Sequence, residues 1–269
     1  MGSKSSKGGA VEGESDTVVD TSSDEAFAET LRLHLKRLIV YAQDSNVATQ
    51  REVAEQLANQ AVKPERQVQI VELGGLKLLL PLTRSADPEV KRLAAHALAN
   101  LSVAADNQTR MAKEGGLDML VYLLGSDGEM IQRQAAKALA NLGVNAENKV
   151  LIASAGGIPP LIRLAGSGPV GVQVEAIAAL ANLAVNDANE ASIADSGGLA
   201  PIIAATKSPD GELQSQAARA LRNLSVREEN KDMIRKLDGV EPLMALARSS
   251  NDRIKQQATR ALLNLGESL

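Results

Sequence analysis

Apolar residues recur along most of this chain at spacings of three and four, the pattern of helices that bury one face. Glycine pairs and short polar runs interrupt the pattern at regular points. Residues 107–144 show one complete unit: a short first helix anchored by Met111, a second helix over about 117–124 and a longer third helix over about 129–144. The pattern therefore predicts an all-α protein from residue 24 onward.

Residues with special backbone properties predict where these helices begin and end. Asn107 is placed to cap the first helix through its side-chain oxygen, and later units have an Asn at the matching position. The pair Gly115-Gly116 ends that helix, because glycine readily takes the left-handed conformation of a helix stop. Near the start of the chain, Ser22 and Glu25 form a capping box that predicts the first helix.

The unit repeats with a period of 41 residues. The period is kept by six asparagines near the ends of the third helices: Asn59, Asn100, Asn141, Asn182, Asn223 and Asn264. A fixed period of this size is typical of a helical solenoid, in which each unit buries its apolar face against its neighbours. The predicted repeats are a degenerate unit at 24–62 and full units at 66–103, 107–144, 148–185, 189–226 and 230–268.

Three helices per unit, the glycine pair, a GGIPPLIRL second helix and an LANL third helix resemble armadillo repeats. The resemblance covers residues 24–269 and implies a right-handed superhelix of about six repeats. It also implies that the third helices line a concave groove, where their Asn side chains hold the backbone of an extended partner. Asparagine suits this role because its amide both donates and accepts hydrogen bonds. The alternative is that each Asn only satisfies the last carbonyls of its own helix or the next loop.

Positions four and eight residues before each Asn lie on the same helix face. Apart from Glu55, the ionisable residues at these positions are basic: Arg51, Arg92, His96, Arg133, Lys137, Arg219 and Arg260. Armadillo proteins of nuclear import have a Trp four residues before the Asn, and this chain has no Trp. The groove therefore resembles the β-catenin and vacuolar types, which implies an acidic or phosphorylated partner segment. The alternative is that these side chains are only solvated surface charges.

Composition limits the other possible functions. The 269 residues include no Cys and only two His, which rules out disulfides and disfavours a metal site. The net charge of −4 gives no argument for nucleic acid binding. A GxGxxG match at 166–171 follows a predicted helix, whereas a dinucleotide site requires a preceding strand. We therefore expect a non-catalytic protein–protein interaction scaffold in the cytoplasm, without cofactor, metal or catalytic residues.

The two ends of the chain suggest alternatives. Residues 1–23 are Gly- and Ser-rich and acidic, which predicts a disordered tail. Gly2 and Ser6 fit the N-myristoylation pattern, so a membrane-recruited adaptor is one alternative, and a chance match or expression scar is another. The sequence stops directly after a third helix, which suggests self-association through the C-terminal end, within a larger cytoskeletal or organellar assembly. A nuclear location is an alternative to the cytoplasm, and a peripheral membrane location is expected only if Gly2 is myristoylated.

Overall fold

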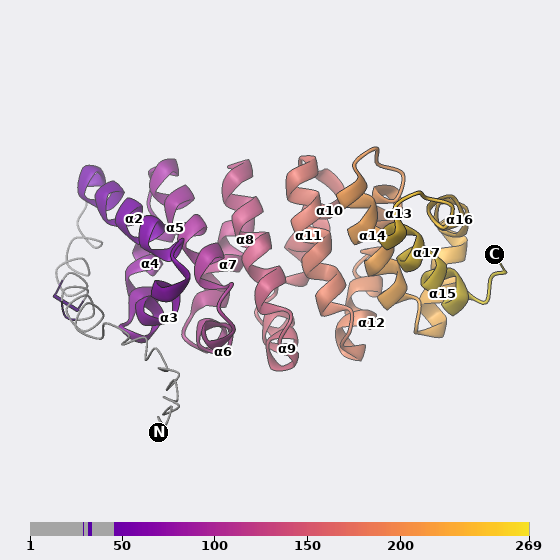
Figure 1. Ribbon diagram of the computed structural model, residues 1–269, viewed down its shortest axis with the longest axis horizontal. Coiled ribbons are helices and arrows are strands. Elements are labelled where there is room, and N and C mark those ends of the chain that lie inside the picture. Colours follow the sequence, from indigo (N-terminus) through magenta and orange to yellow (C-terminus); the bar gives the residue numbers. More distant parts are fainter. Residues whose placement is uncertain (1–28, 30–31, 34–45, 269) are drawn as a thin grey trace, which may run out of the picture.

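The structure is a computed structural model that describes residues 29, 32–33 and 46–268, and within them it contains helices and no strand (Figure 1). The all-α solenoid predicted from the sequence is confirmed. The acidic tail at 1–23, the lipidation candidate Gly2, the Ser22–Glu25 capping box and residues 24–28, 30–31 and 34–45 of the degenerate unit lie outside the described residues.

Each full unit has three helices, as the apolar pattern predicts. The first helices are α3 (Pro64–Glu72), α6 (Ala105–Lys113), α9 (Ala146–Ser154), α12 (Asp187–Asp195) and α15 (Glu228–Lys236). The second helices are α4 (Gly75–Thr83), α7 (Gly116–Leu124), α10 (Ile158–Ser167), α13 (Leu199–Ala205) and α16 (Val240–Leu246). The third helices are α2 (Val47–Ala61), α5 (Pro88–Leu101), α8 (Glu129–Leu142), α11 (Val170–Leu183), α14 (Gly211–Leu224) and α17 (Asp252–Leu265).

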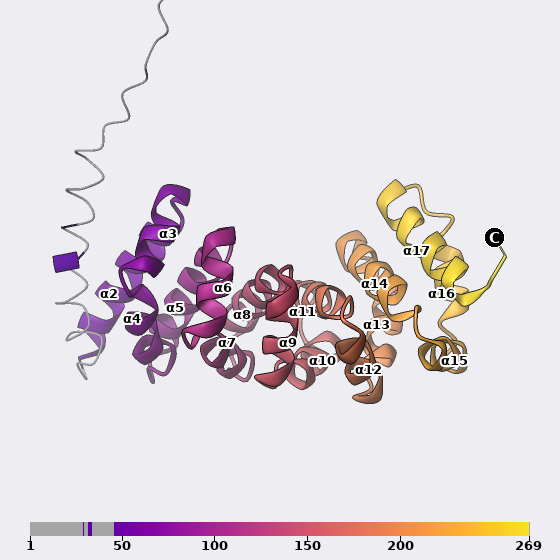
Figure 2. The same ribbon diagram turned by 90° about the horizontal axis from the view of Figure 1, so that it is seen from below.

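The third helices stand side by side in one row from α2 to α17, and each packs against the next (Figure 1). Each second helix packs against the third helix of its own unit. The core is a continuous seam of aliphatic side chains, in which residues such as Leu120, Leu139 and Ile152 are fully buried. Figure 2 shows that the row is curved, with α11 and α14 towards the inside of the curve and α10 and α13 towards the outside.

The glycine pair between the first and second helices has two different physical roles. Gly115 has a φ of 89°, a left-handed conformation that favours glycine, as the sequence predicts. Gly116 has no room for a side chain, because a Cβ there would lie 2.4 Å from the carbonyl oxygen of Met111. In the last unit, Asp238 takes the place of the first glycine and adopts a φ of 55°.

The predicted capping role of Asn107 is wrong. Helix α6 begins at Ala105, so Asn107 lies inside it, fully buried. Its amide donates to the carbonyl oxygens of Gln67, at 2.8 Å, and Leu101, at 2.9 Å, both in the preceding unit. The side chain therefore satisfies backbone groups between neighbouring units instead of the first turn of its own helix.

The same bond pattern recurs in the later units. The amide of Asn148 donates to the carbonyl oxygens of Gln108 and Leu142, at 3.1 Å and 3.2 Å. The side chains that do cap α9 and α12 come three residues earlier: Asn145 accepts from the amide of Asn148, and Asn186 accepts from that of Asn189. The buried asparagines of the first helices thus tie successive repeats together.

Candidate functional site

The candidate site is the inner face, which we define as the solvent-facing side of the third helices α2, α5, α8, α11, α14 and α17. The six periodic asparagines lie in the last turn of these helices. Asn59 on α2 is exposed, and the other five are half-buried. The structure therefore places all six at equivalent positions along one row, with one Asn for each repeat.

Most of these Asn amides already bind another part of the chain. Asn182 donates its Nδ2 to the carbonyl oxygen of Ala140 at 2.8 Å, and Asn223 donates to that of Ala181 at 2.8 Å. Asn264 and Asn141 likewise donate to groups of the preceding unit. Asn182, Asn223 and Asn264 thereby satisfy carbonyls near the end of the preceding third helix. Asn141 instead donates to the hydroxyl of Ser102. Four of the six asparagines therefore link the repeats, because their amides donate to the preceding unit instead of to their own helix.

His96 and Asn100 form a separate polar pair on α5. The Nδ2 of Asn100 lies 3.1 Å from the Nε2 of His96. Burial lowers the pKa of His96, and the positive charges of Arg92 and Lys137 lower it further. The imidazole is therefore neutral at pH 7, and we assign its Nε2 as the acceptor of the Asn100 amide. His96 contributes no positive charge to the inner face at that pH.

Two of the predicted groove cations face carboxylates that the sequence analysis missed. Arg92 forms a bidentate pair with Glu89 on the same helix, with nitrogen–oxygen distances of 2.8 Å and 2.6 Å. Arg133 lies 4.0 Å from Glu175 of the next unit, and burial raises the pKa of that carboxyl group. Glu89 and Glu175 stand neither four nor eight residues before an Asn. The three-residue spacing of Glu89 and Arg92 is the signal that could have revealed their pairing.

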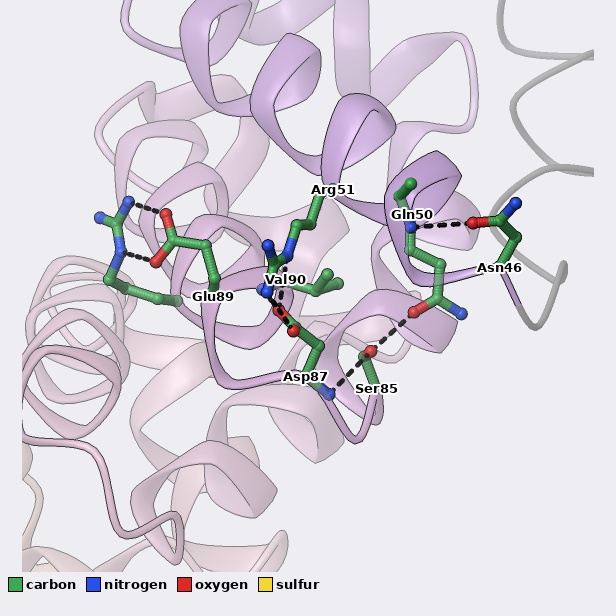
Figure 3. A network of polar contacts seen from close by, with 9 residues as sticks. Asn46, Gln50, Arg51, Ser85, Asp87, Glu89 and Val90 are labelled. Atoms are coloured by element: carbon green, nitrogen blue, oxygen red, sulfur yellow. Dashed lines mark hydrogen bonds and ion pairs between the residues drawn. The ribbon is translucent and has the colours of Figure 1, made fainter.

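Figure 3 shows a polar network at the N-terminal end of the row, which joins α2 to α5. Arg51 donates to both carboxylate oxygens of Asp87, at 3.2 Å and 2.6 Å, and this bond holds the pKa of Asp87 below its usual value. Asp87 also caps α5 by accepting from the amide of Val90 at 3.0 Å. Ser85 donates to the side chain of Gln50 at 2.6 Å. The cations at this end of the inner face are thus paired with acids.

Four cations further along the inner face have no carboxylate within 4 Å among the described residues, although the charge of Lys137 acts on the nearby Glu175. Within the described residues, no carboxylate lies within 4 Å of the cationic nitrogens of Lys137 on α8, Arg219 and Arg222 on α14, or Arg260 on α17. Sequence reasoning missed Arg222, which directly precedes Asn223 at a position that is Ala in the four units before it. Three of these four cations lie on α14 and α17, in the C-terminal half of the row, and Lys137 lies on α8 near its middle.

Arg219 and Arg222 are half-buried, whereas Lys137 and Arg260 are exposed. Arg222 donates to the Oδ1 of the neighbouring Asn223 at 3.1 Å and 3.0 Å, and Arg219 bonds to the preceding unit. Arg219 donates to the Oδ1 of Asn182 at 3.0 Å and to the carbonyl oxygen of Ala178 at 3.2 Å. Burial lowers the pKa of Arg219, and nearby Arg253 and Arg222 act in the same direction. Its guanidinium thus lies near the C-terminal end of α11, where a positive charge is favourable.

Other site types have little support in the described part of the chain. No group of three or more His, Asp or Glu residues there is arranged to hold a metal ion. No single helix among the described ones is long and apolar enough to cross a membrane; α9 and α10 reach that length only together, and they meet at a bend of 85°.

Comparisons with known proteins agree with this architecture. The family model described as "Armadillo/beta-catenin-like repeat" matches residues 63–103, 105–144, 145–185, 186–226 and 227–266. A crystal structure of an engineered protein from the Northeast Structural Genomics Consortium is 35% identical, with a TM-score of 0.79 over 87% of this chain and 96% of that chain. No curated protein sequence matches the chain significantly.

Two designed proteins share the fold at lower identity. One designed armadillo repeat protein is 24% identical, with a TM-score of 0.78 over 85% of this chain and 98% of that chain. A second, solved in complex with the peptide (KR)4, is also 24% identical, with a TM-score of 0.77 over the same shares of the two chains. At this identity the likeness concerns the fold alone.

Proposed function

The chain belongs to the armadillo repeat family, and we propose that it is a non-catalytic scaffold that binds an extended, acidic segment of a partner protein along its inner face. Armadillo solenoids are generally binding scaffolds without catalytic activity. The observation that supports the acidic partner is a group of four cations that have no carboxylate within 4 Å among the described residues: Lys137, Arg219, Arg222 and Arg260. Such cations form charge-assisted hydrogen bonds with carboxylates or phosphates.

The length of the inner face suits an extended chain. Helix packing at about 9 Å per layer spreads the six asparagines over about 45 Å. An extended segment of about 13 residues covers that distance at about 3.3 Å per residue. The uneven charge suggests an orientation rule: the acidic part of the partner lies over α8, α14 and α17, and its less charged part lies over α2 and α5.

The asparagines would contribute to binding in two ways. Asn141, Asn182, Asn223 and Asn264 link adjacent repeats, and they thereby fix the positions of the cations. Asn59 is exposed, and the amide of Asn100 bonds only within its own helix. We therefore propose that direct contact with a partner backbone is made first by Asn59 and Asn100, because they need not give up a bond between repeats.

The charge preference can be tested with two peptides of equal length. We expect (DE)4 to bind the wild-type chain measurably and (KR)4, the ligand of the designed relative, to bind at least about tenfold more weakly. The reason is that the unpaired cations attract the first peptide and repel the second. Fluorescence anisotropy at low and at physiological salt measures both affinities, and the preference should shrink as salt rises. Tighter binding of (KR)4 would contradict the proposed function.

A second candidate is self-association through the C-terminal end. Leu263 on α17 is 63% exposed, and Leu237 near the same end is 40% exposed. Exposed large apolar side chains of this kind suit contact with another copy or a larger assembly. Concentration-dependent sedimentation separates this candidate from a monomeric scaffold. Acylation of Gly2 and a cytoplasmic, nuclear or peripheral membrane location stay predictions.

A further inference from the structure

A cleft with a volume of about 530 Å³ lies between the second helices α13 and α16, which stand at the upper right in Figure 1. Ligand sites in proteins commonly measure about 300–1,000 Å³. The second helices α4 and α7, α7 and α10, and α10 and α13 pack against each other, whereas α13 and α16 have only weak contact. We call this space the α13–α16 cleft. Its lining includes Thr206, Lys207, Gln214, Glu241, Ala245 and Leu246.

The corresponding place between α4 and α7, three repeat periods earlier, is built from residues of the same types. Thr83 corresponds to Thr206, Arg84 to Lys207, Asp118 to Glu241, Leu123 to Leu246 and Ser126 to Ser249. The backbone bonds agree as well, because the amides of Arg84 and Lys207 each donate to the carbonyl oxygen three residues earlier, at 3.2 Å and 3.1 Å. The hydroxyl groups of Thr83 and Thr206 do the same, at 2.8 Å and 2.6 Å. The region between α4 and α7 is therefore a template for the cleft.

The main difference between the two places is an aromatic ring. The space between α4 and α7 holds the side chain of Tyr122, and the guanidinium carbon of Arg84 lies 5.7 Å from the centre of its ring. A cation within about 6 Å of an aromatic face is attracted by it. The corresponding residue of α16 is Ala245, which has only a methyl group. The α13–α16 cleft thus has the surroundings of the Tyr122 ring without the ring itself.

The chain closes the same place in other ways between the remaining second helices. Between α7 and α10, Arg163 stands at the position of Tyr122, and its guanidinium donates to the carbonyl oxygen of Leu124 at 3.1 Å. Between α10 and α13, Gly166 stands at the position of Arg84. A Cβ on Gly166 would lie 3.4 Å from the Cβ of Pro201, so the two segments approach closely there. The open cleft between α13 and α16 is therefore not a general property of the repeat.

We propose that the α13–α16 cleft binds an aromatic side chain, Tyr or Phe, of a partner protein. The ring takes the place that Tyr122 has between α4 and α7, where it packs against Leu246 and lies beside the ammonium group of Lys207. Aromatic side chains that fill pockets are frequent anchors of protein–protein contacts. The proposal goes beyond the proposed function, because the cleft includes none of the inner-face cations.

The polar part of the cleft favours a polypeptide over a free aromatic molecule. The side-chain amide of Gln214 both donates and accepts hydrogen bonds, so it suits the peptide groups that flank an inserted side chain. No ion pair in the described part of the chain involves Lys207 or Glu241. Because these two residues have opposite charges, the cleft selects its partner by the ring and not by net charge.

Short peptides test the proposal. The probe is the blocked tripeptide acetyl-Ala-Tyr-Ala-amide, its control has Leu in place of Tyr, and p-cresol represents the free ring. We expect the tyrosine peptide to bind the wild-type protein with a Kd of about 5 mM or tighter. Titration followed by NMR should shift the methyl signals of Thr206, Ala245 and Leu246. The leucine peptide should bind at least about fivefold more weakly, because it lacks the aromatic face.

Two reciprocal variants fill the cleft or open its counterpart. Ala245 is exposed, so Ala245→Tyr should be tolerated and should weaken binding of the tyrosine peptide at least about tenfold, since the cleft then holds a ring of the chain itself. Tyr122→Ala should open a second site, with two peptides bound per chain and shifts at Thr83 and Leu123. Ala204 is also exposed and does not line the cleft, so Ala204→Tyr is the matched control that leaves binding unchanged.

Several results would overturn the inference. These are no binding of the tyrosine peptide at about 20 mM, equal binding of the leucine peptide, or binding that Ala245→Tyr does not weaken. Binding of p-cresol without binding of the tyrosine peptide would assign the cleft to a free aromatic molecule and would overturn the choice of a partner protein. The acidic peptide (DE)4 has no aromatic side chain, so the proposed function and this inference can fail independently.

Discussion

A variant that combines Lys137→Glu with Arg260→Glu is expected to bind the acidic peptide (DE)4 at least about 100-fold more weakly than wild type. Each change removes a charge-assisted contact of about 1.5–3 kcal/mol and adds repulsion between like charges. Two such losses exceed about 2.8 kcal/mol, which corresponds to about a hundredfold change in affinity. Both side chains are exposed and have no carboxylate partner within 4 Å among the described residues, so the fold should be retained. Fluorescence anisotropy measures the affinity, and circular dichroism checks the fold.

A control with the same change in net charge separates the inner face from bulk electrostatics. Lys77 lies on the second helix α4 and Lys207 follows the second helix α13, and both are exposed. Lys77→Glu with Lys207→Glu should weaken binding only slightly. An equal loss in both variants would mean that net charge alone governs binding. Arg219 is a poorer choice for this test, because its bonds to Asn182 and Ala178 would be lost together with its charge.

The change Asn148→Ala is expected to lower the free energy of unfolding by about 2–4 kcal/mol, although Asn148 lies away from the inner face. The side chain is fully buried and donates to the carbonyl oxygens of Gln108 and Leu142. Alanine leaves both carbonyls without this donor and leaves a cavity between two first helices. Urea denaturation followed by circular dichroism measures the loss, provided that the unfolding is a single transition.

The neighbouring residue Asn145 provides the control for Asn148. Asn145 caps α9 through its side-chain oxygen, which accepts from the amides of Glu147 and Asn148. Asn145→Ala should cost only about 1 kcal/mol, the usual value of an N-cap. If Asn148→Ala cost no more than Asn145→Ala, the buried asparagines of the first helices would not link the repeats.

The fold could be predicted from the sequence because a solenoid unit contacts mainly its neighbours. Local features such as the pair Gly115-Gly116 and the apolar spacing around Leu139 then specify most of the packing. The prediction failed for Asn107, which has the right residue type for a helix cap. Its real partners, Gln67 and Leu101, belong to the preceding unit, and the residue pattern within one unit does not show how neighbouring units stack.

The candidate site was predicted less completely, for the same reason. The sequence indicates which residues share the inner face, such as Asn182 and Lys137. It does not indicate that the Asn182 amide donates to Ala140, 42 residues away, because that bond depends on how α11 stacks on α8. Ion pairs within the chain also change which cations of the inner face are available to a partner. Arg92 is bonded to Glu89, whereas Arg222, at a position that is Ala in the four units before it, has no carboxylate partner within 4 Å among the described residues.

The central claim is that the inner face of the solenoid binds an extended acidic chain. It is tested most directly by attaching a photoreactive group to (DE)4, cross-linking the peptide to the wild-type protein and identifying the labelled residues by mass spectrometry. We predict labels on the exposed sides of α8, α11, α14 and α17, and their loss in the variant with Lys137→Glu and Arg260→Glu. Labels confined to the second helices, such as α10 and α13, would contradict the claim.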